Sequence, residues 1–159
     1  MTDLVYRFPD CDFADWERLH ALLDWAFAPM AARIDPPSSM TRLTPKLLAE
    51  KAGDELLLTC MSGDVLVATA FVRPEAGWAY IGKIAVQDKW RKRGITRRML
   101  DIVEAHGRKA GWSHLELQVR VELTENLATF GALGFVETAR TAHAGYDRPT
   151  SVTMQKRLA

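Results

Sequence analysis

One stretch near the middle of the chain, Tyr80–Leu100, limits the fold more than any other. It reads YIGKIAVQDKWRKRGITRRML, and its first seven residues suit a buried strand. A polar turn follows with six cations between Lys89 and Arg98 and a glycine at Gly94, and then an apolar pattern with helical spacing. A helix that begins after a basic, glycine-containing turn presents free backbone N–H groups and the positive end of its dipole to an anion. The stretch therefore predicts a phosphate-binding turn.

The positive charge of the chain is concentrated at this turn. The 159 residues include 21 basic and 20 acidic ones, which gives a net charge of +1. Without the six cations of Lys89–Arg98, 15 basic residues stand against 20 acidic ones, or −5. A general nucleic-acid-binding protein spreads its basic residues over a face or an arm. We therefore expect a local anion site and no nucleic-acid partner.

Length and composition predict one globular domain over residues 1–159. No apolar run reaches 18 residues, so we expect no membrane span. The opening MTDLVYRFPD lacks the basic region and apolar core of a signal peptide. Cys11 and Cys60 belong to no metal-type cluster, so we expect no metal and favour a reduced, cytoplasmic location.

Periodicity and turn signals predict an α+β fold with a single mixed sheet of about seven strands flanked by helices. The expected strands are 4–8, 55–61, 65–73, 78–86, 114–119, 135–141 and 151–157. The expected helices are 12–30, 44–51, 95–110 and 125–133, with Asp12, Thr44 and Thr124 as N-caps and Gly111 after the third helix. Strands 78–86 and 114–119 are joined through a helix, so they should be parallel.

The basic turn is compatible with three kinds of phosphate ligand. A nucleotide loop of the Walker type needs a Gly-Lys-Ser/Thr ending, which is absent. A dinucleotide loop needs the glycines of GxGxxG, which are also absent. The third ligand is the pyrophosphate of coenzyme A.

A sequence motif supports the pyrophosphate of coenzyme A as the ligand. Arg91 and Gly94 take the first and fourth places of the pattern Gln/Arg-x-x-Gly-x-Gly/Ala, and Thr96 stands at the sixth. This stretch resembles the acyl-CoA signature of the GNAT superfamily of N-acetyltransferases. KIAV before the turn is similar to the family's strand-end motif, and Leu133–Phe135 resembles its late Tyr-x-x-x-Gly-Phe element. Together with the element order, the resemblance spans essentially the whole chain, and RIDPPSS and HAGYDRPT look like a bacterial subgroup.

The resemblance implies a fold with splayed central parallel strands and a coenzyme A site between them. The pantetheine arm would pair with the strand end, the amides of Arg93–Arg97 would hold the pyrophosphate, and Arg91 and Lys92 would add charge. The implied cofactor-binding residues are Ile84, Ala85, Val86, Arg91, Lys92, Arg93, Gly94, Ile95, Thr96, Arg97, Asn126 and Phe130.

Three positions depart from the family pattern. Phe130 stands where many relatives carry the tyrosine that protonates the departing thiolate, and phenylalanine has no proton to donate. Asn126 lies four residues before that place, whereas the family's usual asparagine lies seven before it. Thr96 adds a side chain where close backbone approach is wanted, although its hydroxyl can donate to a phosphate.

Three side chains are candidates for the missing acid and base. Tyr80 lies near the strand position where some relatives carry a glutamate base, where it can position a water or the amine, but a half-buried strand aromatic is the favoured explanation. His143 titrates near neutrality and suits proton removal, and Tyr146 offers a phenol in place of Phe130. Both of the latter also suit a role as loop anchors.

Four further residues are candidates for the acceptor site. Asp35 and Ser39 fall in the proline-rich turn RIDPPSSMTR, where they can line a pocket or cap neighbouring helices. Arg120 and Glu122 follow the second splayed strand, where they can contact substrate or form surface ion pairs.

The sequence thus predicts an acyl-CoA-dependent N-acetyltransferase. It would move the acetyl group of acetyl-CoA to a primary amine of a small molecule, or less favourably of a peptide, by direct attack. The alternative is an inactive acyl-CoA sensor of the same fold, and a third hypothesis uses KWRKRGITRR as a nucleic-acid-binding arm. We expect no membrane partner, and an exposed edge strand makes a homodimer an expectation as well.

Overall fold

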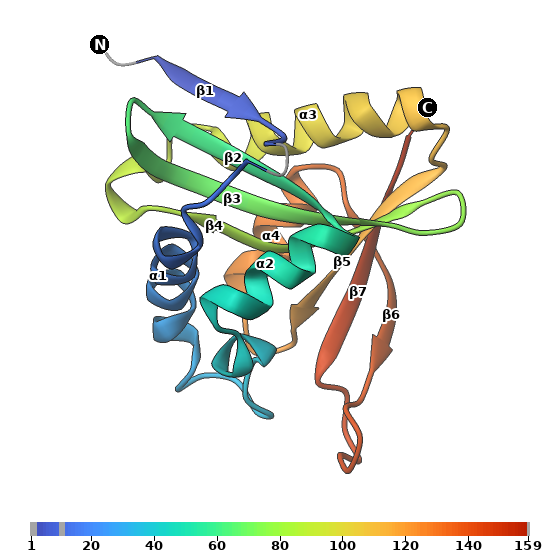
Figure 1. Cartoon of the computed structure of the whole chain (residues 1–159). Helices are drawn as coiled ribbons and strands as arrows, with labels where there is room; N and C mark the ends of the chain where they lie inside the picture. Colours follow the sequence, from blue (N-terminus) through green and yellow to red (C-terminus); the bar gives the residue numbers. More distant parts are fainter. Residues whose placement is uncertain (1–2, 10–11, 159) are drawn as a thin grey trace.

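A mixed sheet of seven strands in the order β1-β2-β3-β4-β5-β7-β6 organises the computed structural model, which describes residues 3–9 and 12–158 (Figure 1). The strands are β1 (Leu4–Arg7), β2 (Leu56–Ser62), β3 (Val65–Pro74), β4 (Ala79–Val86), β5 (His114–Arg120), β6 (Val136–Thr141) and β7 (Ser151–Arg157). The helices are α1 (Trp16–Phe27), α2 (Pro45–Asp54), α3 (Ile95–Ala110) and α4 (Thr124–Ala132), with short 3₁₀ helices η1 (Ala28–Met30), η2 (Ser39–Arg42) and η3 (Asp88–Trp90).

The sheet has one parallel pair, β4 with β5, within the described residues. The connection between these two strands runs through η3 and α3. A parallel pair needs such a crossover, whereas the hairpins β2–β3 and β3–β4 need only short turns. The predicted α+β fold with a mixed seven-stranded sheet is therefore confirmed.

Two apolar clusters hold helices against opposite faces of the sheet. On one face, Leu19 and Leu23 of α1 and Leu48 of α2 are fully buried with Phe71 of β3. On the other face, α3 contributes a stripe of buried side chains to the larger cluster, which α4 also contacts. Figure 1 shows α1 and α2 over the β2–β4 half of the sheet. We call this the α1/α2 face and the opposite one the α3/α4 face.

Helix ends follow local capping signals in some places and tertiary packing in others. Thr44 accepts a hydrogen bond from the Leu47 amide at 3.1 Å, and Gly111 is left-handed at φ 80°, so both predicted ends are confirmed. Asp12 does not cap α1, which begins only at Trp16 after a residue whose side chain caps nothing. Thr124 is the first residue of α4 and not its cap, so that prediction was one residue off.

An irregularity in β4 changes which face its side chains occupy. Gly82 pairs with Phe71 and Ala85 with Thr69, so two residues of β4 oppose one residue of β3. The first of the two, Lys83, has a left-handed backbone at φ 53°. A bulge of this kind bends the strand and breaks the alternation of its side chains.

No helix among the described residues is long and apolar enough to cross a bilayer.

Candidate active site

The parallel strands β4 and β5 separate after their first two pairs. Ala79 lies opposite Leu115 and Tyr80 opposite Glu116, and no pair follows along the rest of β4. Backbone groups in a protein interior are normally hydrogen-bonded. The side of β4 that faces β5 has no strand partner from about residue 82 to Val86, so an extended ligand can pair with it there.

The N-terminus of α3 lies just beyond the end of β4 and has no side-chain cap. Its N-cap residue, Gly94, has φ 77° and no side chain to offer. The first helical bond runs from the Arg98 amide to the Gly94 carbonyl at 3.0 Å, so the three amides of residues 95–97 have no helical acceptor. These amides and the helix dipole favour an anion at this point.

Two arginines of the basic turn rest on aromatic rings. The Arg91 guanidinium lies 5.5 Å from the Trp25 ring centre, and its Nε contacts the Val86 carbonyl at 3.4 Å. The Arg93 guanidinium lies 4.9 Å from the ring centre of Trp90. Such contacts hold a cation near a surface without neutralising it. Lys92, in a left-handed conformation at φ 61°, is exposed beside them.

Two of the predicted coenzyme A contacts lie on α4. Phe130 is half-buried and packs edge to face on Phe135, with ring centres 6.0 Å apart. Asn126 is half-buried in the first turn of the helix. Phe130 supplies an apolar wall to the α3/α4 face and has no proton to donate.

On the α1/α2 face, two loops distant in sequence meet at the open end of the gap. The Tyr146 hydroxyl, in the β6–β7 loop, donates to Asp35 Oδ1 at 2.5 Å. Arg148 of the same loop lies 3.5 Å from Asp35 Oδ2 and 3.9 Å from Glu122 Oε2. Arg120 donates to the carbonyls of Pro36 (2.5 Å) and Pro37 (3.1 Å). The structure thus brings together predicted substrate and catalytic residues from three parts of the chain.

Two of the candidate acid–base groups lie in or beside this cluster. The His143 ring bonds through Nδ1 to the hydroxyl of Thr150, and burial followed by the nearby Arg120 charge lowers the pKa of its imidazole. The hydrogen bond to Asp35 is the main reason that the pKa of Tyr146 is raised. His143 is therefore neutral at pH 7 and able to accept a proton, while Tyr146 keeps its own.

Tyr80 lies at the closed end of the gap, where β4 and β5 are still paired. Its ring is half-buried with the Arg73 guanidinium 4.7 Å from its centre. Burial is the main cause that raises the pKa of its hydroxyl. A phenol with a raised pKa is a poor base at neutral pH.

Lys83 is a site residue that the sequence predictions missed. Its ammonium donates to Ser39 Oγ at 2.8 Å and lies 5.9 Å from the Phe27 ring centre, which places it on the α1/α2 face beside the gap. Burial is the main cause that lowers its pKa. The signal was a single charge inside the otherwise apolar strand YIGKIAV.

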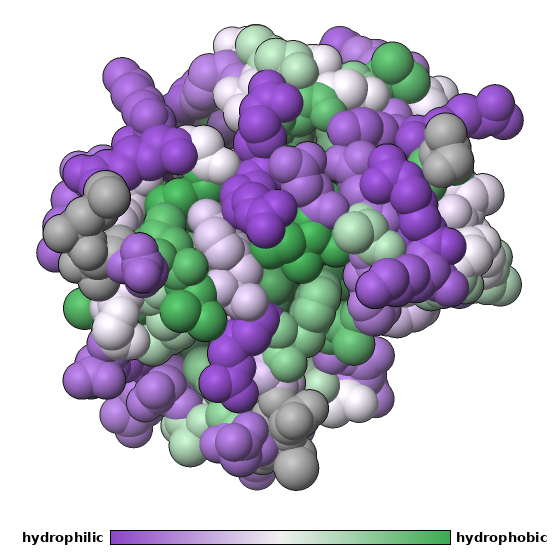
Figure 2. All heavy atoms as spheres, turned by 90° about the horizontal axis from the view of Figure 1, so that it is seen from above, coloured by the Kyte–Doolittle hydropathy of each residue, from purple (hydrophilic) through white to green (hydrophobic). Residues whose placement is uncertain are grey.

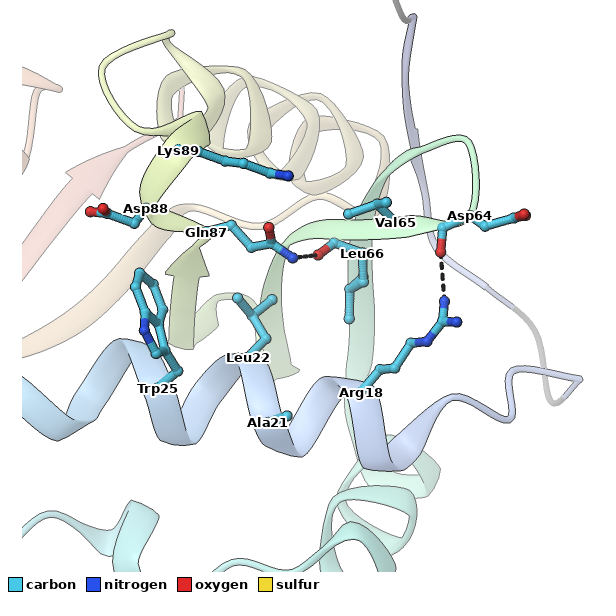
Figure 3. A pocket seen from close by; sticks show the side chains of 10 residues that line it. All are labelled: Arg18, Ala21, Leu22, Trp25, Asp64, Val65, Leu66, Gln87, Asp88 and Lys89. Carbon is cyan, nitrogen blue, oxygen red and sulfur yellow. Dashed lines mark hydrogen bonds between the residues drawn. The ribbon is translucent and has the colours of Figure 1, made fainter.

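A cleft of about 730 Å³ lies elsewhere, on the β3 side of β4. Figure 3 shows side chains from α1, the β2–β3 turn and the segment after β4 around it, with Gln87 bonded to the Leu66 carbonyl and Arg18 to that of Asp64. None of its lining residues belongs to the gap between β4 and β5. Its size therefore does not make it the acetyl-transfer site.

The described residues include no group that could hold a metal ion, and their large exposed apolar side chains lie on different elements. No group of three potential metal ligands occurs among residues 3–9 and 12–158. Figure 2 shows a largely hydrophilic face with apolar atoms in the hollows between polar ones. The exposed large apolar side chains are on different elements and include Val5 on β1 and Val136 on β6. Scattered exposure of this kind is normal.

A mixed sheet whose central parallel strands separate beside an uncapped helix N-terminus defines the acyl-CoA N-acyltransferase fold. The chain belongs to the acetyltransferase (GNAT) family, whose sequence model matches residues 16–135. The family resemblance read from the sequence is thereby confirmed. No curated protein sequence matches the chain.

Solved structures of similar fold cover nearly the whole chain at low identity. The PaiA N-acetyltransferase of Thermoplasma acidophilum, in complex with coenzyme A, has a TM-score of 0.77 and 15% identity over 98% of this chain and 99% of that one. The ribosomal-protein-S18-alanine N-acetyltransferase of Escherichia coli has a TM-score of 0.72 and 18% identity, with coverage of 99% and 95%. An aminoglycoside 6′-acetyltransferase type Ii has a TM-score of 0.78 and 16% identity, with coverage of 98% and 97%.

Proposed function

We propose that this chain transfers an acetyl group from acetyl-CoA to a primary amine of a small molecule by direct attack. One observation carries the proposal: the gap between β4 and β5 opens next to the free amides of residues 95–97. A pantetheine arm needs extended backbone partners, and a pyrophosphate needs free N–H donors. The two features lie in succession along one stretch of chain.

The donor would be held mainly by backbone groups. We assign the pantetheine arm to Ile84, Ala85 and Val86, and the pyrophosphate to the amides of Arg93–Arg97, with Arg91 and Lys92 adding charge. The free amides before Arg98 support this assignment. Asn126 and Phe130 would contact the arm from the α3/α4 face. The Thr96 hydroxyl would donate to a phosphate oxygen.

The acceptor would approach from the α1/α2 face. His143 would remove a proton from its ammonium, and the amine nitrogen would then attack the thioester carbonyl carbon. Backbone amides at the end of β4 would stabilise the developing oxyanion. As the carbon–sulfur bond breaks, Tyr146 would protonate the departing thiolate, and the second proton lost from the amine nitrogen would restore the Tyr146 hydroxyl. Tyr80, with its raised pKa, would position the amine or a water molecule and not act as the base.

A covalent route through a cysteine has no support in the described part of the chain. Cys60 is fully buried in β2, and burial raises the pKa of its thiol. A nucleophilic cysteine needs a lowered pKa and access to substrate. Cys11 lies outside the described residues.

The tied loops favour a small acceptor. Asp35, Tyr146 and Arg148 join the α1–α2 loop to the β6–β7 loop over the α1/α2 face. A wall of this kind suits a compact molecule better than an extended peptide. The similar structures bear names with both kinds of acceptor, a ribosomal protein and an aminoglycoside, so they do not decide the matter.

A two-part experiment tests the proposal. Thermal unfolding with and without coenzyme A tests the donor site, because a ligand that binds the native state raises the Tm. Release of free thiol from acetyl-CoA with a panel of primary amines then tests transfer. Stabilisation without thiol release would support the sensor alternative. DNA binding without stabilisation by coenzyme A would support the nucleic-acid hypothesis.

Two further proposals, on location and on oligomeric state, rest on the sequence and the edge strands. A reduced, cytoplasmic location in a bacterium rests on the cysteine usage and on the likeness of RIDPPSS and HAGYDRPT to a bacterial subgroup. A homodimer rests on the edge strands β1 and β6. Cell fractionation tests the location, and sedimentation tests the homodimer.

A further inference from the structure

Most cations around the proposed acceptor side form ion pairs, but two do not. Lys51 bonds to Glu55 at 2.6 Å, Arg33 pairs with Glu125, and Arg148 lies between Asp35 and Glu122. Most cations on this face therefore have a carboxylate partner. Lys83 and Arg120, both half-buried, are the exceptions among the described residues near the gap.

The partners of these two cations are neutral. Lys83 Nζ donates to the hydroxyl of Ser39, and Arg120 donates to two proline carbonyls. A half-buried ammonium or guanidinium normally has a carboxylate or phosphate to offset the loss of water. Here the hydrogen-bond donors are satisfied in part, but the charges are not.

The pKa of Lys83 reflects these surroundings. Its pKa is lowered by burial first, and then by the Lys51 charge, which Glu55 opposes, and by Arg120. Because Lys51 and Glu55 form an ion pair, their influences on Lys83 largely offset each other. Arg120 adds a like charge to this environment. The two cations therefore reinforce each other across the gap, which is the condition for attracting an anion.

The position of the two cations relates them to the reaction. The bulge at Lys83 turns its side chain onto the α1/α2 face immediately before Ile84–Val86, the segment assigned to the pantetheine arm. Arg120 ends β5 on the other side of the gap. Glu116, the acidic residue of β5, is held by Gln155 at the closed end, away from Arg120.

We propose that the acceptor carries an anionic group, a carboxylate in the first instance, which binds between Lys83 and Arg120 while its amine faces the thioester. The proposal rests on the acetyl-transfer function proposed above and narrows its substrate class to acidic amines such as amino acids. The Ser39 hydroxyl, now bonded to Lys83, would turn to the same carboxylate. Polyamines and other purely cationic acceptors would be repelled.

The test compares acceptors that differ only in their charge. Thiol release from acetyl-CoA is measured with L-alanine, L-leucine and L-glutamate, each against its α-carboxamide. The protein should favour an acid over its amide by about 10- to 100-fold in kcat/KM, equivalent to about 1.4 to 2.8 kcal/mol at 1.4 kcal/mol per tenfold. Equal or better turnover of amides or of spermidine would overturn the proposal.

Variants test whether Lys83 causes the preference for an acid over its amide. Lys83→Gln keeps a donor for Ser39 and removes the charge, so it should abolish the preference for an acid over its amide, chiefly by raising the KM for the acid. Lys46→Gln removes an exposed lysine of α2 and serves as the matched control. Arg120→Lys keeps the charge and loses the fork to the proline carbonyls, so part of the preference should persist. An unchanged preference in Lys83→Gln contradicts the proposal.

A binding measurement separates this proposal from the proposed function. With coenzyme A in place of acetyl-CoA, L-leucine should stabilise the wild-type protein more than L-leucinamide does, and Lys83→Gln should lose that difference. If no amine is acetylated but this difference is present, acetyl transfer fails and the anion site stands. If coenzyme A binds and amines react without any preference for acids, transfer stands and the anion site fails.

Discussion

The proposed donor and acceptor sides of the gap differ in the kind of chemical group that forms them. On the donor side, the groups assigned to coenzyme A are mostly backbone amides, at the end of β4 and in residues 95–97. On the acceptor side they are side chains, among them Lys83, Arg120 and Tyr146, held by two loops. A backbone site depends on strand geometry and one glycine. A side-chain site depends on every residue in it. The first kind is shared across a family, and the second makes a protein particular.

The largest effect should come from the acceptor side. His143→Gln should lower kcat by about 100-fold, since general bases contribute about 10²–10⁴-fold. The pKa of His143 is lowered, so the wild-type imidazole stays neutral and active at pH values below its ordinary value of about 6.5. The acid limb of kcat/KM against pH should therefore lie below about 6.5 and disappear in the variant. His106→Gln, in a histidine packed between Phe8 and Trp112, is the control. An unaltered pH profile in His143→Gln would exclude the assignment.

A donor-side change should weaken coenzyme A binding by about tenfold or more. Gly94→Ala forces a side chain into a left-handed backbone, which costs about 1–2 kcal/mol, and shifts the amides that follow. Gly63→Ala in the β2–β3 turn is matched to it, because Gly63 is also left-handed and its added Cβ would also meet no neighbour. Both variants should lose similar stability in urea unfolding. Calorimetric titration should show weaker coenzyme A binding in Gly94→Ala alone.

A milder acceptor-side change should leave the donor side untouched. Asp35→Asn weakens the tie to Arg148 and alters the bond from Tyr146. The KM for the acceptor should rise by about three- to tenfold, and stability should change by less than about 1 kcal/mol because the pair is exposed. Asp24→Asn on α1 is the control. A change in coenzyme A affinity would show that the two sides are not independent.

The smallest effect concerns stability alone. The folded state holds Lys83 with a lowered pKa, so the charged form is penalised there and not in the unfolded chain. Stability should therefore rise as the pH rises through the folded pKa toward the unfolded value of about 10.4. Lys83→Met should be more stable at pH 7 by up to about 1 kcal/mol and should lack this rise. Urea unfolding at pH 7 and pH 9.5 measures both effects, and equal stability at pH 7 would contradict the prediction.

The sequence predicted the fold around the proposed donor site well because its signals are local. Gly94, the cations around it and the apolar spacing after it lie within one stretch, and so does the glycine that ends α3. The parallel pairing of β4 and β5 followed from the crossover between them. Thr44 before Pro45 likewise carried its own capping signal.

The acceptor side was predicted in part, because its contacts are long-range. Asp35, Arg120, Glu122 and Tyr146 were each named from the sequence, but nothing local indicated that Tyr146 would donate to Asp35 across 111 positions of the chain. Lys83 was missed for a different reason. Strict alternation from Tyr80 would turn it toward the α3/α4 face, and only the bulge brings it to the α1/α2 face.

Predicted helix starts were wrong where tertiary packing, and not an N-cap side chain, determined the first residue of the helix. Asp12 has the side chain of an N-cap, yet α1 begins at Trp16, where the buried stripe of the helix starts to contact the sheet. Asp15 precedes the helix and its carbonyl accepts the Leu19 amide at 3.0 Å, but its side chain caps nothing. Propensity places such an end only to within a few residues.

The bonds from residues 33–37 across the gap have a consequence for any change of acceptor. Arg33 pairs with Glu125, and Arg120 holds the carbonyls of Pro36 and Pro37, at the end where β4 and β5 share no ladder. In the proposed function the same segment walls the acceptor. A substitution in this wall that admits a new amine would also alter the contacts that join the two halves of the sheet. A change of acceptor is therefore expected to change stability as well.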